Sequence, residues 1–130
     1  MKKGNKIMED KKFKLLSLLN NSNFYKNERK FKVFMNLLDN VEFLLPFNNN
    51  HIVVLVSEED KIYIPLFTDE KQIKDVEYTR LDKVKLDVVI KDIYKTSNYH
   101  AVSINPFTNN YVINKKLIEI FSVLNKIYFL

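Results

Sequence analysis

Cysteine is absent from this 130-residue chain, and glycine occurs only once, as Gly4. Without cysteine the chain has no disulfide, no thiolate nucleophile and no zinc–thiolate site. Loops that cradle phosphates need several closely spaced glycines, so a P-loop or a dinucleotide-binding loop is also excluded. No apolar run approaches the roughly 18 residues of a membrane span, and the basic start lacks the apolar stretch of a signal peptide. We therefore expect a cytoplasmic protein that is not bound to a membrane.

Residue types that commonly carry catalysis or hold metals are few and scattered. The two histidines, His51 and His100, stand alone at the starts of predicted strands, without the HxH or HExxH spacing of a zinc site. No glycine-flanked turn presents Ser57 or Ser103 as a nucleophile. The acidic cluster at 58–60 lacks the spacing of a calcium loop and fits a solvated turn. We expect a protein that is not an enzyme and that needs no metal or other cofactor.

The chain does contain enough apolar side chains for one hydrophobic core. Hydrophobic residues make up 46% and charged residues 28%, an ordinary globular composition. Ten phenylalanines and seven tyrosines argue against disorder, because they supply apolar surface that offsets the entropy of the chain. The length suits one domain, so we expect a single domain over residues 1–130, with residues 1–8 as a flexible leader.

Apolar stripes with the helical period predict the main helices. Phe31, Phe34, Met35 and Leu38 follow the spacing i, i+3, i+4, i+7, which places them on one helical face. Comparable stripes recur elsewhere, and Asn114 is suited to cap the last helix. The helices expected from these stripes cover residues 8–19, 28–38, 86–95 and 115–125.

Alternating and β-branched segments predict the strands. The run HIVVLV at 51–56 is typical of a strand buried on both faces. A polar loop joins it to KIYIPL at 61–66, which predicts a β-hairpin with Pro65 at a sheet edge or strand end. Further expected elements are a strand at 41–45, a helix starting at Asp69, a strand at 76–81, and a hairpin of 99–104 with 111–113.

Together these elements predict an α+β fold. We expect a central, mostly antiparallel (mixed) sheet of about four to six strands, with 51–56 in its interior and the helices packed on it.

Two short segments resemble a known family. One is IPLFTDE at 64–70, a strand that contains proline and leads into a helix start, and the other is VSINPF at 102–107, a strand that runs into Asn-Pro. In this order, with a helix between them and another after Asn114, they resemble the N-terminal domain of the SseB (enhanced serine sensitivity) family over about residues 28–124. The resemblance implies a small α/β fold with a binding or regulatory role, and no reaction or cofactor.

The residues of these two segments have a structural and a functional interpretation. In the structural one, Phe67 fills the core at the junction of sheet and helix, and the Asn105 side chain satisfies turn backbone groups before Pro106. In the functional one, both segments end on one edge of the sheet and line a groove for a partner segment. The candidate groove residues are Pro65, Phe67, Thr68, Asn105, Pro106 and Phe107.

The net charge of +5 is unevenly distributed along the chain. Residues 1–32 hold ten Lys or Arg against three acidic residues, whereas the remainder holds eleven against thirteen. Lysines of the N-terminal helices, such as Lys11, Lys12, Lys14 and Lys30, are expected to face solvent and could contact phosphates. Only one arginine lies among them, and a lysine- and asparagine-rich composition also explains the bias. The sequence therefore predicts a protein-interaction or regulatory domain, with a nucleic-acid-binding accessory protein as the alternative.

Overall fold

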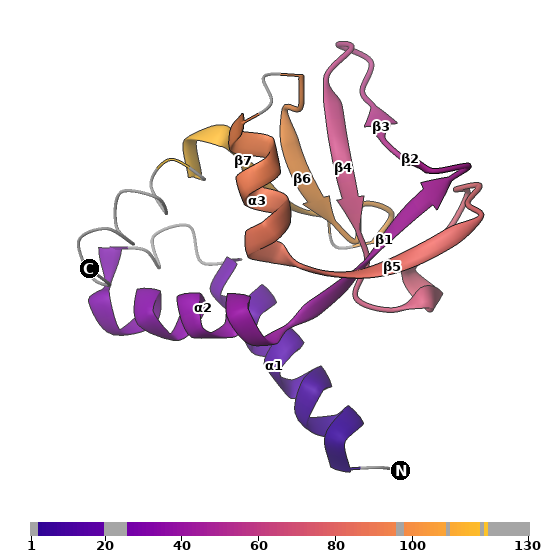
Figure 1. Cartoon of the computed structure of the whole chain (residues 1–130). Helices are drawn as coiled ribbons and strands as arrows, with labels where there is room; N and C mark the ends of the chain where they lie inside the picture. Colours follow the sequence, from indigo (N-terminus) through magenta and orange to yellow (C-terminus); the bar gives the residue numbers. More distant parts are fainter. Residues whose placement is uncertain (1–2, 20–25, 96–97, 109, 118, 120–130) are drawn as a thin grey trace.

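The structure, a computed structural model, describes residues 3–19, 26–95, 98–108, 110–117 and 119. Within these residues, helices and strands mix in an α+β fold, as the sequence predicts. Figure 1 shows the helices gathered toward the left and bottom, with the strands fanning out to the right. The elements are α1 (Lys3–Leu19), α2 (Glu28–Asn40), β1 (Glu42–Asn48), β2 (His51–Ile52), β3 (Leu55–Val56), β4 (Ile62–Leu66), the 3-10 turn η2 (Glu70–Gln72), β5 (Arg80–Lys85), α3 (Leu86–Lys95), β6 (Ala101–Ile104) and β7 (Tyr111–Asn114).

The strands of the described residues form two sheets rather than the single central sheet expected from the sequence. One sheet has the order β2-β1-β5 and the other the order β3-β4-β6-β7. All pairs are antiparallel except β4 with β6, which are parallel. Leu44 of β1 and Phe67, just after β4, join the two sheets through backbone hydrogen bonds of 2.8 and 3.0 Å.

The segment 51–56 does not form the buried interior strand that the sequence predicts. Its first half is β2, at the edge of one sheet, and its second half is β3, at the edge of the other. Val53 and Val54 lie between the two strands, and the Val53 backbone N–H donates to the Pro46 carbonyl at 3.0 Å. Val56 is 60% exposed. An apolar run predicts that side chains are buried, but it does not predict which strand each residue pairs with. The pattern alone therefore cannot distinguish one continuous strand from two short edge strands.

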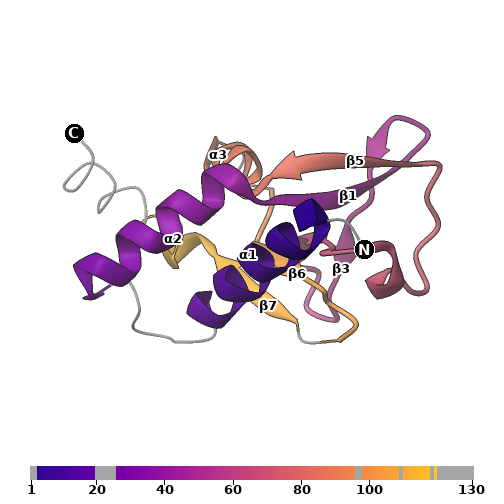
Figure 2. The same cartoon turned by 90° about the horizontal axis from the view of Figure 1, so that it is seen from below.

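The hydrophobic core lies between the helices and one face of the four-stranded sheet. Helix α2 forms where the apolar stripe predicts it: Asn27 accepts a capping hydrogen bond from the Lys30 N–H at 3.1 Å, and Phe31 and Phe34 are fully buried. Figure 2 shows α1 and α2 from the side that carries them. The same core cluster contains Leu15 of α1, Leu86 and Val89 of α3, Phe43 and Leu45 of β1, and Ile64, Leu66, Val102, Ile104 and Ile113 of the four-stranded sheet.

The boundaries of three further elements agree only in part with those predicted from the sequence. Helix α1 begins at Lys3, so the backbone of residues 3–8, which the sequence predicts as part of a flexible leader, is helical. The helix expected at Asp69 is a single 3-10 turn without an Asp69 side-chain cap and without a buried residue, because no apolar stripe supports a longer one. The strand expected at 76–81 begins at Arg80.

The last cap and the second hairpin follow the expected pattern, whereas the first hairpin pairs only through Leu55 and Val56. Strand β3 pairs with β4, and β6 pairs with β7, both antiparallel. The Asn114 side chain accepts the Leu117 N–H at 2.9 Å and thereby caps a helical segment at 115–117 and 119. The rest of the helix predicted to reach residue 125 lies outside the described residues. Of the helices that the structure describes, none has both the length and the apolarity to cross a membrane.

Candidate functional site

The parallel pairing of β4 with β6 places the segments 64–70 and 102–107 side by side. Leu66 lies opposite Ile104, so Phe67 and Thr68 follow one strand exactly where Asn105 and Pro106 follow its neighbour. The six residues that the sequence selects are therefore neighbours in space. They differ in solvent exposure. Pro65, Phe67 and Asn105 are buried, and Thr68 and Pro106 are half-buried, whereas Phe107 is 39% exposed.

Thr68 and Asn105 form a hydrogen-bonded junction between the two segments. The Asn105 Oδ1 atom accepts the Thr68 N–H at 3.1 Å, and Asn105 Nδ2 donates to Thr68 Oγ1 at 3.1 Å. The Asn105 N–H donates to the Leu66 carbonyl at 2.8 Å. Asn105 has φ of 52°, a left-handed conformation that asparagine tolerates better than most residues. Asn105 is thus a structural residue that locks the end of β6 to the end of β4.

Phe67 and Thr68 also connect more distant parts of the fold. Phe67 is completely buried, and its backbone forms the bridge to Leu44 that joins the sheets. The Lys12 ammonium of α1 donates to the Thr68 carbonyl at 2.8 Å. Lys12 therefore does not face solvent as the sequence predicts. The position at which β4 ends is a junction of α1 and both sheets, which gives Phe67 and Thr68 a structural role.

Pro106 and Phe107 lie in a β6–β7 loop that is held in place by its own hydrogen bonds. The Asn105 carbonyl accepts the N–H groups of Thr108 at 3.1 Å and of Asn110 at 2.9 Å. The Ser103 hydroxyl donates to Asn110 Oδ1, and the Thr108 hydroxyl donates to Gln72 Oε1 at 2.8 Å. The Phe107 ring stacks on the buried Phe67 ring with 6.3 Å between centroids. The loop therefore presents a half-exposed aromatic ring on a fixed backbone.

The four-stranded sheet has an outer face that does not belong to the main core. Residues on one face of a strand alternate with those on the other. Ile64, Val102 and Ile113 point into the core, so Tyr63, Ser103 and Val112 belong to the opposite face. Val112 is 44% exposed.

A groove of about 330 Å³ lies on this outer face. It includes Pro106 and Phe107 from the six predicted residues, while Pro65, Phe67, Thr68 and Asn105 do not line it. Its walls come from β3, β4, β6, β7 and the β6–β7 loop. The residues that line it are Leu55, Val56, Ser57, Tyr63, Ser103, Pro106, Phe107, Asn110 and Val112.

The described residues that line this groove are apolar or neutral and polar, and none of them is charged. The sequence did not single out Leu55, Val56, Tyr63 or Val112, although all lie in segments predicted as strands. The alternation in KIYIPL and YVIN separates two faces within each strand, but only the pairing of Leu55 with Tyr63 and of Ser103 with Val112 brings them to one surface.

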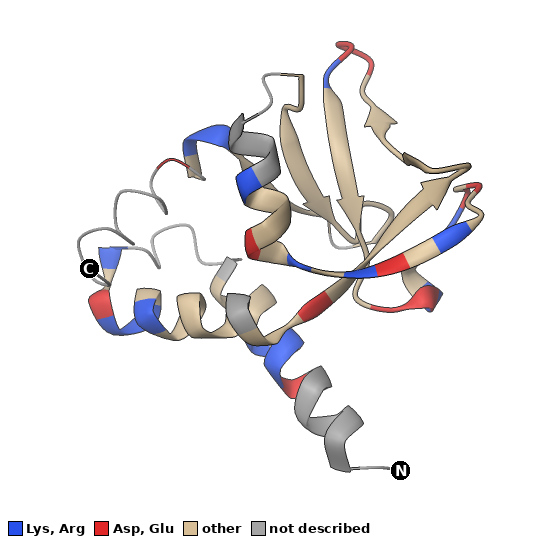
Figure 3. Cartoon of the chain, in the orientation of Figure 1, with Lys and Arg blue, Asp and Glu red and all other residues tan. Residues whose placement is uncertain are grey.

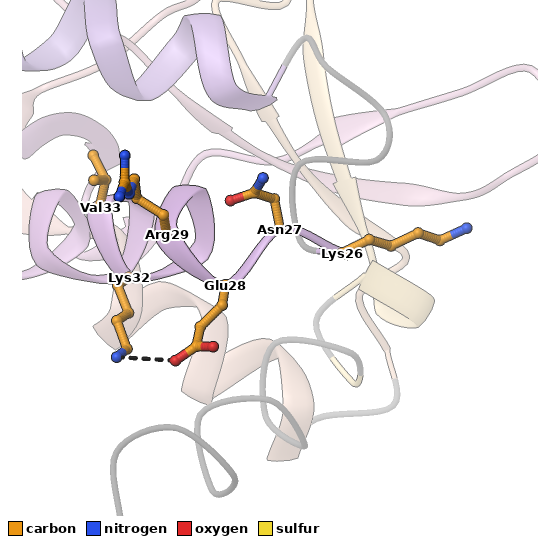
Figure 4. Close-up of a pocket in the computed structure, with 6 residues that line it drawn as sticks. All are labelled: Lys26, Asn27, Glu28, Arg29, Lys32 and Val33. Carbon is orange, nitrogen blue, oxygen red and sulfur yellow. Dashed lines mark ion pairs between the residues drawn. The ribbon is translucent and has the colours of Figure 1, made fainter.

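The basic start of α2 borders a larger cavity of about 790 Å³ (Figure 4). Its cations do not converge: Figure 4 shows Lys26, Arg29 and Lys32 pointing in different directions. Lys32 forms an ion pair with Glu28 at 3.1 Å, and both side chains are about half exposed. This arrangement provides dispersed positive charge on a helical surface rather than a built anion site.

The histidines and serines considered from the sequence each have their own surroundings in the structure. His51 is exposed in β2, and the His100 ring packs edge-on against Tyr63 with centroids 5.3 Å apart. Ser57 Oγ accepts the Lys61 N–H at 3.1 Å, and the Ser103 hydroxyl is bonded to Asn110. Among the described residues no three His, Asp or Glu side chains gather closely enough to hold a metal ion.

The fold and the groove define the chain as a small α+β domain with an apolar surface site. Comparisons with protein-family models, with curated proteins and with solved structures find no match to this chain. Any functional conclusion must therefore come from the groove itself.

Proposed function

We propose that this chain is a non-enzymatic protein-interaction domain whose outer groove receives a segment of a partner protein. The observation that carries the proposal is the uncharged groove on the outer face of the four-stranded sheet, with Val56, Phe107 and Val112 exposed by 60%, 39% and 44%. Exposed apolar side chains that line one surface groove are typical of interaction sites.

Binding at this groove would bury apolar surface on a site that is already ordered. Covering a large apolar side chain completely stabilises a complex by roughly 1.5–3 kcal/mol. The groove walls are strands and a loop fixed by the hydrogen bonds of Ser103, Asn105 and Thr108. Because these groups need little further ordering, less of the binding free energy is lost to conformational entropy.

The SseB resemblance agrees with such a binding or regulatory role, and we propose a cytoplasmic location with it. The resemblance rests largely on residues that build the junction beneath the groove, namely Phe67, Thr68 and Asn105. In this proposal the junction supports the site, and the partner contacts Pro106, Phe107 and the neighbouring strand residues.

Selection of peptides from a displayed library of random dodecapeptides tests the proposal. The selected peptides should bind the wild-type domain, and the Val112→Lys variant should lose most of this binding because an ammonium group would be desolvated in the groove. Val88→Lys is the matched control: Val88 is 51% exposed on α3 and outside the groove, so binding should be unchanged. Binding is measured by fluorescence anisotropy, and folding of both variants by circular dichroism.

Amide chemical shifts then locate the bound peptide. Perturbations should concentrate at residues 55–57, 63 and 103–112. Peptides that bind Val112→Lys as tightly as wild type, or a library that yields no binder, would contradict the proposed function.

A further inference from the structure

The four-stranded sheet differs in charge from the rest of the chain. Its first two strands and their turn, residues 55–66, carry Glu58, Glu59, Asp60 and Lys61, a net charge of −2. Residues 98–114 contain no Lys, Arg, Asp or Glu at all. Figure 3 shows β3, β4 and β6 without charged residues, apart from the turn between β3 and β4. A chain with a net charge of +5 therefore has an acidic rim at this sheet.

The acidic turn adjoins the groove and has a fixed backbone. It begins directly after Ser57, which lines the groove. The Ser57 N–H donates to the Lys61 carbonyl and the Asp60 N–H to the Ser57 carbonyl, both at 2.9 Å. Asp60 has φ of 62°, the left-handed conformation that closes such a turn. The backbone that carries these carboxylates is thus fixed directly beside a groove-lining residue.

The one cation of this turn does not neutralise it. Lys61 Nζ forms an ion pair with Glu59 at 3.1 Å, which leaves the charges of Glu58 and Asp60. All four side chains are exposed. Glu58 and Asp60 therefore remain available to a cation supplied by a bound molecule.

We infer that the partner segment is an apolar peptide with Lys or Arg at the end that lies beside the turn at 57–61. This inference rests on the proposed function and names its partner class. Apolar side chains fit the uncharged lining, and basic side chains complement the rim, which favours orientation and encounter. Nucleic acid, an acidic peptide or an anionic membrane would meet like charge at this position.

The composition of the selected dodecapeptides is the first test. Peptides whose binding is lost in Val112→Lys should combine apolar residues with an excess of Lys and Arg over Asp and Glu. Neutral or acidic peptides that bind through the groove would overturn this inference and leave the proposed function standing. Absence of any binding that depends on Val112 would overturn both.

Matched variants of the domain give the second test. The probes are a fluorescein-labelled selected peptide and an analogue of it in which every Lys and Arg is replaced by Ser. Exposed ion pairs are weak, so the Ser analogue should bind the wild-type domain about fivefold more weakly. Glu58→Lys should remove this preference, whereas Glu77→Lys, an exposed carboxylate on the segment before β5, should retain it. The preference should also shrink between about 0.05 M and about 0.5 M salt.

Two outcomes would overturn the inference directly. One is a preference for the basic peptide that survives in Glu58→Lys or at high salt. The other is a dimer of the free domain in analytical ultracentrifugation that dissociates in Val112→Lys, which would make a second copy of this chain the occupant of the groove.

Discussion

Replacement of Phe67 by alanine tests whether this residue is structural, as its position in the fold requires. The ring is fully buried, its backbone joins the two sheets, and Phe107 stacks on it. Truncating a buried phenylalanine costs about 3–5 kcal/mol, because apolar contacts are lost and a cavity remains. Domains of this size are stable by only about 5–15 kcal/mol, so this loss is a large part of the total.

Urea denaturation followed by circular dichroism measures the effect. With a slope of about 1–3 kcal/mol per molar urea, a loss of this size lowers the midpoint by about 2 M. The control is Phe13→Ala, which removes the same ring from a side chain that is 74% exposed on α1. That variant should change the free energy of unfolding by no more than about 0.5 kcal/mol.

The comparison of the two variants decides between the interpretations of Phe67. If Phe67→Ala unfolds at the same urea concentration as Phe13→Ala, the ring does not support the core and the structural assignment is wrong. A groove role would instead leave stability within about 1 kcal/mol of wild type while peptide binding is lost.

Further predictions concern the junction and the basic helices. Asn105→Ala should destabilise the domain by about 2–4 kcal/mol in urea melts, because it loses the hydrogen bonds to Thr68 and because alanine adopts a positive φ less readily than asparagine. Asn105→Gly should recover part of this loss, and equal melts of the two variants would show that the backbone conformation is unimportant. Nucleic acid should bind no more tightly than about 10⁻⁴–10⁻⁶ M at physiological salt in electrophoretic shift assays. Glu substitutions at Lys11, Lys14 and Lys30 should not change peptide binding, whereas submicromolar binding to DNA or RNA would favour the nucleic-acid alternative.

Elements whose signals are local could be predicted from the sequence. The stripe of Phe31, Phe34 and Met35 specified α2, because residues spaced at the helical period share one face and must be buried together. The Asn114 cap and the two hairpins likewise followed from side chains and turns within a few residues. The expectation that the strand ends near residues 67 and 105 lie at one edge of the sheet agrees with the pairing of Leu66 with Ile104, but the pattern does not say which of these residues reach the surface.

Tertiary structure decided the features that depend on pairing between distant segments. Residues 51–56 became edge strands of two sheets, because the Val53 N–H bonds to Pro46 while Leu55 pairs with Tyr63. Phe67 became buried and Phe107 half-exposed, although both are phenylalanines that follow strands. The groove combines residues separated by more than fifty positions, and only the registers of β3, β4, β6 and β7 bring them to one face. Strand register is a property of the assembled sheet, and a pattern read along one strand does not contain it.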